Sequence, residues 1–369
     1  MKTKTAVLIV SCLSLAFAAW TIAAAVGAAT ELRGIPWSQV AADHAITPDN
    51  ARVRDASGKL LVSQSVDNDG DGKVDELLYL GTGDGKVTIF AGTEPVPALE
   101  NRVVARYAPE RSDDFAWENE LVGFRAYGPA LRKGIENAGI DVMTKRVPYP
   151  ALEKWFRDEK VGKTYHIDTG TGYDNYKVNA SLGCGGSAVW GSDGRLYLGE
   201  TYTTWKQYAA GPLRAVWELN YGPWTVDGKN ITEKKLFSFD LGDRMFKVTD
   251  TFYIDGQPAK GLPVAVGVAT HEGKAEAFGD QEKGILVVTE KQDGAWLGLG
   301  VYAPPSQIVE YRNIKSNDRD QNNAVFILKT DDNGQVVYYA GYAWEKWGGI
   351  TTVEQWKDYL SKFADQHGM

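Results

Sequence analysis

The chain has 369 residues, and its 40 Lys and Arg against 48 Asp and Glu give a formal net charge of −8. This acidic balance, without a basic tract, argues against binding to nucleic acid or to an anionic membrane surface. With only two cysteines, Cys12 and Cys184, a cysteine-based metal site is excluded.

Residues 1–29 are predicted to be a secretory signal peptide, since two lysines precede an apolar run that ends in small residues. The run is long enough for an uncleaved anchor, but its alanine-rich exit into Glu31 favours cleavage. A lipoprotein site at Cys12 is disfavoured, because the apolar segment before it is too short. We therefore expect a periplasmic or secreted protein of charge −10 after loss of the two lysines. It would have one thiol and no stable membrane insertion.

An aspartate-rich loop follows at residues 67–76, with sequence DNDGDGKVDE. Its acids at positions 1, 3, 5 and 9 are Asp67, Asp69, Asp71 and Asp75. Oxygen ligands at alternate positions, with glycine at position 6, suit a structural Ca²⁺ ion. An EF-hand would need glutamate at position 12, where this chain has leucine, so a short strand-linked calcium loop and a simple acidic turn both remain open.

The segment 115–129, FAWENELVGFRAYGP, is predicted to include a strand from residue 121. The pleat would place Asn119, Arg125 and Tyr127 on one face. A guanidinium with an amide and a phenol can grip a carboxylate, because the arginine fork matches its two oxygens. The alternative is that Arg125 pairs with a neighbouring glutamate, Glu118 or Glu120, and only stabilises the fold.

Residues 165–186, YHIDTGTGYDNYKVNASLGCGG, concentrate titratable groups among glycines and show neither helical nor strand periodicity. The groups are His166, Asp168, Asp174, Lys177, Tyr165, Tyr173 and Tyr176. Such a segment is typical of a loop that presents side chains at a cleft, and an ordinary polar loop is the alternative. Lys145, shortly before it, adds a cation with the same ambiguity. Arg214 begins a later strand whose polar face could contribute to substrate binding or to the fold.

Short alternating segments between turn signals dominate the rest of the chain. They are residues 214–221, 236–240, 246–253, 263–270, 284–290, 296–302, 324–329 and 336–343. Asp-Gly and Asn-Gly pairs between them suit tight turns. This pattern predicts an all-β fold, a large antiparallel two-sheet sandwich. We expect short helices near 129–137 and 151–157, a C-terminal helix at 351–366, and a single domain over residues 31–369.

Several motifs together resemble an exported bacterial family known only as a domain of unknown function and frequent in polysaccharide-utilisation clusters. They are WEN (117–119), FRAYGPA (124–130), YH (165–166), GTGYDNYKVN (170–179), LGCGG (182–186) and GPLR (211–214). The resemblance implies a galactose-mutarotase-like β-sandwich. It also implies a role in carbohydrate metabolism, with an acidic oligo- or polysaccharide as the ligand.

The leading hypothesis is an enzyme acting on uronate-containing glycans, a lyase working by β-elimination or a hydrolase. In a lyase, Arg125 with Asn119 would neutralise the sugar carboxylate. His166 would remove the proton, with Lys145 or Lys177 as substitutes. No catalytic cofactor is expected.

Tyr176 or Tyr127 would then protonate the leaving oxygen, and Trp117 with other aromatic residues would line a sugar groove. In a hydrolase, Glu118 and Asp174 would be the carboxylate pair. Two further readings are a non-catalytic glycan-binding protein and a sugar epimerase or mutarotase.

Overall fold

The computed structural model describes residues 30–41, 45–81, 86–317 and 321–368. The predicted signal peptide, residues 1–29, lies outside the described residues. No described helix combines the length and apolar character that crossing a membrane would require.

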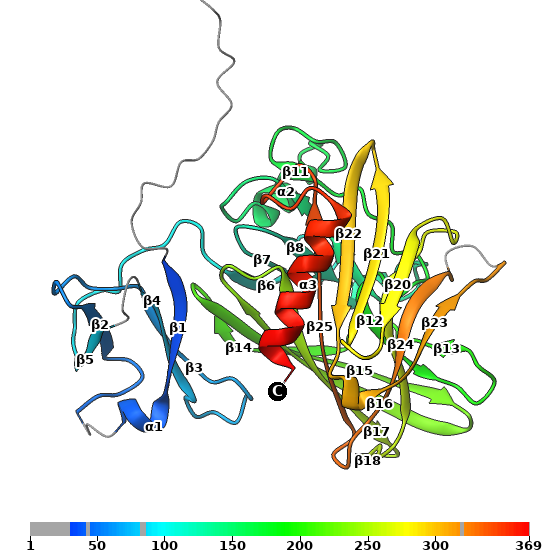
Figure 1. Cartoon of the computed structure of the whole chain (residues 1–369), viewed down its shortest axis with the longest axis horizontal. Coiled ribbons are helices and arrows are strands. Elements are labelled where there is room, and N and C mark those ends of the chain that lie inside the picture. Colours follow the sequence, from blue (N-terminus) through cyan, green and yellow to red (C-terminus); the bar gives the residue numbers. More distant parts are fainter. Residues whose placement is uncertain (1–29, 42–44, 82–85, 318–320, 369) are drawn as a thin grey trace, which may run out of the picture.

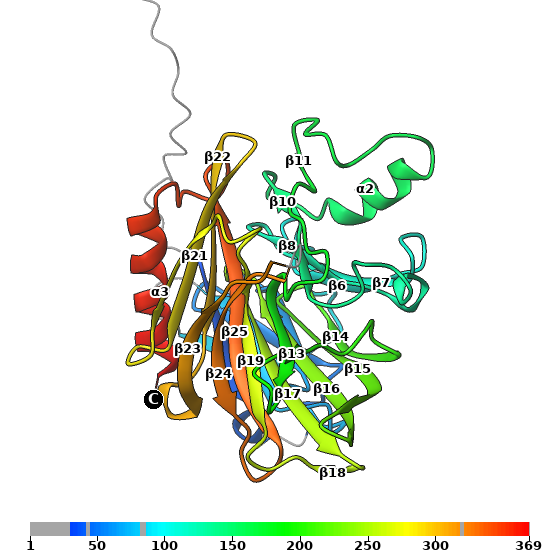
Figure 2. The same cartoon turned by 90° about the vertical axis from the view of Figure 1, so that its right-hand side faces the viewer.

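Two antiparallel sheets packed face to face form the body of the molecule (Figures 1 and 2). The larger sheet has nine strands in the order β14 (Thr204–Ala210), β15 (Arg214–Val226), β16 (Lys229–Asp240), β17 (Met245–Ile254), β25 (Gln335–Trp344), β22 (Ala295–Tyr302), β21 (Ile285–Gln292) and β20 (Glu276–Asp280), with β18 (Gln257–Pro258) paired to β17. The smaller sheet has the order β13 (Leu196–Tyr197), β12 (Cys184–Trp190), β19 (Pro263–Ala269), β24 (Asn323–Lys329) and β23 (Ile308–Ile314). The predicted all-β sandwich is therefore confirmed.

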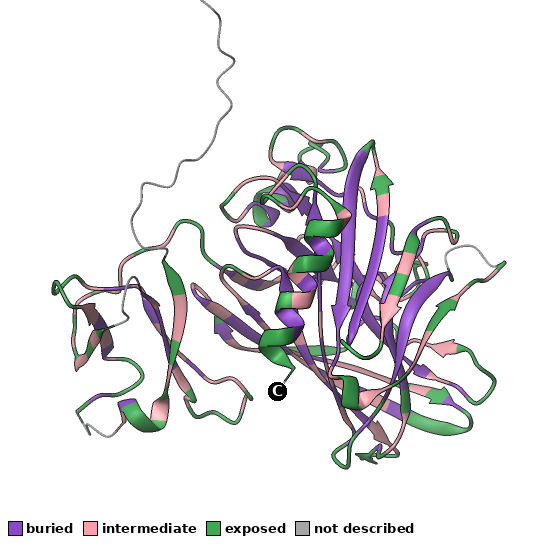
Figure 3. Ribbon diagram, viewed as in Figure 1, coloured by how far each residue is buried: buried purple, intermediate pink, exposed green. Residues whose placement is uncertain are grey.

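The alternation of side chains explains why these strands bury one face. In β16 every second residue from Ile231 to Phe239 is buried, and the residues between them are partly exposed. The apolar faces of both sheets meet in one large core that includes Phe237, Phe246 and Val266. Figure 3 shows this buried interior between the sheets.

The N-terminal strands form two small sheets beside the sandwich (Figure 1). One has the order β1 (Glu31–Pro36), β4 (Glu76–Gly81) and β3 (Ser63–Val66), and the other pairs β2 (Ala51–Asp55) with β5 (Val87–Ala91); α1 (Trp37–Val40) follows β1. They enclose a small core around Val53 and Leu77. Val66 and Leu78 pack with Leu213, directly before β15, and with Val216 of β15, which joins the two parts.

A four-stranded sheet contains most of the segment 115–129, including Arg125. Its order is β6 (Val104–Ala108), β7 (Asp114–Glu118), β8 (Gly123–Ala126) and β9 (Ile140–Val142), and the 3₁₀ helix η1 (Pro129–Leu131) follows β8. One face contributes Phe115 and Phe124 to the main core. The other face packs on α2 (Leu152–Glu159) through Ala116 and Met143. The two-stranded pair β10 (Thr144–Lys145) and β11 (Gly172–Tyr173) lies nearby.

The C-terminal helix α3 (Val353–His367) covers the outer face of the large sheet, on the side of the molecule away from α2 (Figure 2). Its buried residues Trp356, Leu360 and Phe363 pack with Trp296 and Tyr302 of the sheet. Thr352 begins the helix, and its hydroxyl accepts a hydrogen bond from the Gln355 amide. One further 3₁₀ helix, η2 (Pro305–Gln307), precedes β23.

Candidate functional site

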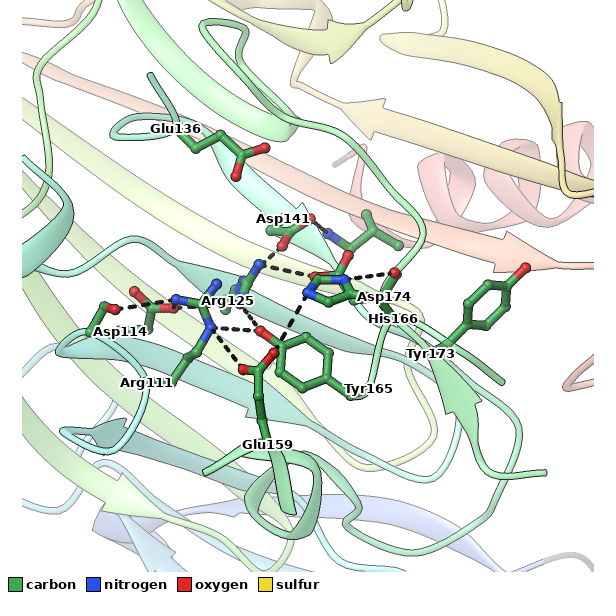
Figure 4. A network of polar contacts seen from close by, with 12 residues as sticks. Arg111, Asp114, Arg125, Glu136, Asp141, Glu159, Tyr165, His166, Tyr173 and Asp174 are labelled. Atoms are coloured by element: carbon green, nitrogen blue, oxygen red, sulfur yellow. Dashed lines mark hydrogen bonds and ion pairs between the residues drawn. The ribbon is translucent and has the colours of Figure 1, made fainter. Parts of the chain in front are cut away.

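Arg125 is the centre of a buried polar network at the end of the four-stranded sheet (Figure 4). It lies on β8 directly opposite Asp141 on β9, so the strand register brings these two side chains together. Its Nε donates to Asp141 Oδ2 at 2.7 Å, its Nη1 to the Tyr165 hydroxyl at 2.9 Å, and its Nη2 to Asp174 Oδ2 at 3.0 Å. The network therefore joins two strands to the glycine-rich segment 165–174.

His166 extends this network to the surface. Its side chain is 52% exposed, and its Nδ1 lies 3.6 Å from Asp174 Oδ2 and 3.3 Å from the Asp174 main-chain oxygen. Its Nε2 lies 3.8 Å from Glu159 Oε1 at the end of α2. The Asp174 amide donates to the Tyr165 carbonyl, which folds the segment back on itself. The structure thus brings Arg125, Asp174 and His166 together.

Burial controls the protonation of the acids in this network. It raises the pKa of Asp141 to about 8 and that of Asp174 to about 6, against the attraction of the Arg125 guanidinium. Asp114, which lies 3.7 Å from Arg125 Nη1, has its pKa raised to about 6 for the same reason. Burial thus favours the protonated form of both acids, and more strongly that of Asp141 than that of Asp174, the acid beside His166.

Sequence reasoning missed four members of the network: Arg111, Asp114, Asp141 and Glu159. Arg111 Nε donates to the Tyr165 hydroxyl at 2.6 Å and lies 4.0 Å from Glu159. The charged run at 110–114 was a signal that these residues do more than form a turn. Asp141 gave no such signal, because only the pairing of β8 with β9 places it against Arg125.

The carboxylate-gripping role predicted for Arg125 and Asn119 is wrong. Arg125 is 2% exposed and all three of its nitrogens already donate to protein groups. The Asn119 amide nitrogen donates to the carbonyls of Asp240 and Asp243, and its oxygen accepts from two backbone amides. Trp117 is fully buried among core aromatic rings rather than lining a groove.

Lys145 and Glu118 form a buried ion pair that anchors α2, and this corrects their predicted catalytic and substrate-binding roles. The Lys145 ammonium donates to Glu118 Oε2 at 2.7 Å and to the carbonyls of Asn119 and Tyr149. Glu118 also accepts from the amides of Ala151 and Leu152, where α2 begins. All three hydrogens of this ammonium are donated to protein acceptors, so Lys145 is not available to act on a substrate.

Lys177, Tyr176 and Tyr127 do not converge on His166. Lys177 is exposed and lines a separate cavity of about 400 Å³ with His271 and Glu290. Tyr176 is buried with its ring 4.9 Å from that of His271, and its hydroxyl has no hydrogen-bond partner among the described residues. Tyr127 is buried with its ring centroid 5.4 Å from the Arg125 guanidinium carbon. Neither phenol reaches solvent, which argues against the predicted protonation of a leaving oxygen.

Arg214 connects the N-terminal strands to the large sheet, and it also lines a cavity of about 250 Å³. Its guanidinium donates twice to Asp240, and also to Glu76 Oε2 at 2.8 Å and Asn68 Oδ1 at 2.9 Å. These contacts are the structural role that the sequence left open for this residue.

The aspartate loop brings three of its four predicted ligands together. Asp67, Asp69 and Asp71 each offer a carboxylate oxygen, and these oxygens lie within 4.8 Å of one another. Asp75 is not in this group, and its Oδ2 accepts from the Asn68 amide at 2.7 Å. Three converging hard oxygen ligands fit Ca²⁺, and the calcium site remains a prediction.

Comparison with solved structures finds two proteins from Enterococcus faecalis, one titled as a member of glycosyl hydrolase family 38 and one as an alpha-mannosidase. They are 12% and 11% identical to this chain, with TM-scores of 0.46 and 0.44. Each match covers 92% of this chain, which spans less than half of either protein.

The sequence comparisons give a closer match. "Uncharacterized protein P7" of Formosa agariphila is 32% identical over 330 residues, which are 85% of this chain and 82% of that protein. The model of the family described as "Domain of unknown function (DUF4861)" matches residues 25–368. The chain therefore belongs to the DUF4861 family.

Proposed function

We propose that this protein is an exported enzyme, periplasmic or secreted, that cleaves uronate-containing glycans by β-elimination with His166 as the base. The observation that carries the proposal is the half-exposed imidazole held beside a buried carboxylate. Asp174 faces Nδ1 of His166 and is itself fixed by Arg125 Nη2 at 3.0 Å. A base on a loop needs such support to keep its orientation.

The chemistry follows from this arrangement. With a proton on Nδ1 directed at Asp174, the other nitrogen, Nε2, is the one that accepts a proton from substrate. Nε2 would take the proton α to the uronate carboxylate, the electron pair would form the C4–C5 double bond as the C4–O bond breaks, and the leaving oxygen would take a proton from water. The negative charge of Asp174 would stabilise the imidazolium that forms.

Hydrolysis is the second candidate, and the position of Glu159 favours it. The Glu159 side chain is 37% exposed and its Oε1 lies 3.8 Å from His166 Nε2. A carboxylic acid and an imidazole at the same point could share the proton transfers that a glycosidic bond requires. This pair replaces Glu118 and Asp174, which are both buried against protein groups.

The test is to incubate the mature chain with pectate, alginate and glucuronate-containing polysaccharides and to follow two signals. A lyase produces new reducing ends together with the ultraviolet absorbance of an unsaturated uronate. A hydrolase produces reducing ends without that absorbance. Binding without either signal would contradict the enzyme proposal and indicate a glycan-binding protein. An epimerase or mutarotase would change the sugar without either signal.

A further inference from the structure

A cavity of about 600 Å³ lies between α2 and the segment 163–172, next to the network of Arg125. This volume falls within the ~300–1,000 Å³ typical of small-ligand sites. The Tyr165 side chain belongs to both features, since it lines the cavity while its hydroxyl accepts from Arg125 and Arg111. His166, the proposed base, is the next residue along the chain.

The lining combines aromatic surface with hydroxyl groups. Tyr149 and Ile167 line the cavity although they are 40% and 63% exposed, which is unusual for large apolar side chains. The Trp155 indole also lines it, and its Nε1 donates to Thr171 Oγ1 at 3.0 Å, which fixes the ring. Fixed aromatic rings pack well on the C–H face of a pyranose, and nearby hydroxyl groups can bond its hydroxyls.

The charges around the cavity favour an anion. Three charged residues line it, Lys154, Lys163 and Asp158. The Lys154 ammonium pairs with the Asp158 carboxylate within the helix. The Lys163 ammonium, in contrast, makes no ion pair with any residue of the described ranges. Two cations and one acid thus line the cavity, for a net charge of +1, and Lys163, which attracts Asp158 without forming an ion pair with it, is in a position to bind a ligand carboxylate.

We propose that this cavity binds an acidic sugar ring of the glycan, with the sugar carboxylate on Lys163 and the ring face on Tyr149 and Trp155. The inference rests on the proposed function, because it names where the substrate of His166 is held. It also supplies a cation that can bind a carboxylate of the glycan, which the buried Arg125 cannot do. A glycan bound in this cavity would extend over residues 164–166 to reach the imidazole of His166.

Titration calorimetry on the full mature chain carrying His166→Ala tests binding without turnover. The probes are trisaccharides of galacturonate and mannuronate and a glucuronate-containing disaccharide, each compared with its methyl ester, which removes the charge. We expect at least one acid to bind about tenfold more tightly than its ester, the factor expected for one ion pair. Equal affinity of every acid and ester, or no binding of any acid, would overturn the inference.

Variants locate the binding. Lys163→Met should abolish the preference for the acid and leave ester binding unchanged, whereas Tyr149→Ala should weaken both ligands. Both residues are exposed, so the fold should be retained. Lys283→Met, at an exposed lysine of the β20–β21 turn, is the matched control and should change nothing.

The outcomes separate the two proposals. Acid-selective binding that depends on Lys163, without any product from the unsubstituted chain, would keep the sugar site and refute the enzyme. Products whose formation is unaffected by Lys163→Met and Tyr149→Ala would keep the enzyme and refute this cavity as its sugar site.

Discussion

The guanidinium of Arg125 holds Asp141, Asp174 and Tyr165 in a space that is almost closed to water. Removing it leaves two acids buried without their counter-charge, and a buried ion pair broken on one side costs about 3–5 kcal/mol. We therefore predict that Arg125→Met lowers the free energy of unfolding in urea by about this amount. Arg312→Met, which removes an exposed pair with Glu310, should leave the unfolding curve unchanged. An equal effect of the two substitutions would show that the network does not support the fold.

His166 should behave in the opposite way, because its side chain is half exposed and contributes little to packing. We predict that His166→Gln reduces turnover by at least ~100-fold, the usual contribution of a general base, while thermal unfolding stays the same. His367→Gln, at the end of α3, is the matched histidine control and should retain full turnover. Retained activity in His166→Gln would remove this residue from the proposed mechanism.

At the scale of single elements, helix α2 depends on a residue outside itself. Glu118 of β7 accepts from the amides of Ala151, the N-cap residue, and Leu152, the first helical residue, and it pairs with Lys145, all in a buried position. Glu118→Gln removes the charge and leaves Lys145 buried, so we predict a loss of about 3 kcal/mol in unfolding free energy. Hydrogen exchange should also accelerate in residues 151–159. Glu153→Gln, which removes an exposed pair with Arg157 in the same helix, should do neither.

The aspartate loop offers a second prediction at this scale. Binding of Ca²⁺ to the folded state alone raises stability by about 2.7 kcal/mol when the free ion is at 100 times its Kd. We predict that millimolar calcium raises the midpoint of thermal unfolding and that a chelator reverses the shift. Asp69→Asn and Asp71→Asn should abolish the response, while Asp75→Asn should keep it, because Asp75 lies outside the cluster. A calcium response that survives the first two substitutions would place the ion elsewhere.

Local patterns in the sequence were sufficient for the elements but not for their pairing. The alternation at residues 236–240 predicts the second part of β16, and the helical spacing of Trp356, Leu360 and Phe363 predicts α3, since each pattern is contained in one segment. The sequence likewise predicts His166 and Asp174 as parts of one site, because both lie in the segment 165–186. The partners of Arg125 depend on how β8 pairs with β9, and no single segment records that register.

At the scale of the whole molecule, buried acids are spread through the sandwich. Between the smaller and the larger sheet of the sandwich, Ser187 Oγ lies 2.7 Å from both Glu233 Oε1 and Asp250 Oδ2. The Lys235 ammonium also pairs with Glu233 at 2.9 Å. A hydroxyl has one hydrogen and can donate to only one of the two acids. The other acid must therefore carry its own proton, and burial does raise the pKa of Asp250 well above its usual range.

These acids make the folded chain a net acceptor of protons. Burial raises the pKa of Asp114 and Asp174 to about 6, that of Asp243 to about 7 and that of Asp141 to about 8. In the unfolded chain the same groups titrate near pH 4. Between pH 4 and 8 the folded state thus binds more protons than the unfolded state, and stability falls as pH rises through this window.

We predict that the free energy of unfolding in urea is higher at pH 5 than at pH 8, with each buried carboxyl contributing up to ~1.4 kcal/mol per pH unit in its own window. The surface acids with lowered pKa, such as Asp55 and Asp158, change their protonation below pH 4, so they do not alter the stability between pH 5 and pH 8. Asp250→Asn replaces one buried acid with a side chain that is neutral at every pH. It should therefore flatten the pH dependence of the unfolding free energy and raise stability at pH 8 relative to the unsubstituted chain. Asp332→Asn, at an exposed turn, should leave the slope unchanged. Stability that rises from pH 5 to pH 8 would mean that these carboxyls are ionised in the folded protein and that the interior is far more hydrated than its packing indicates.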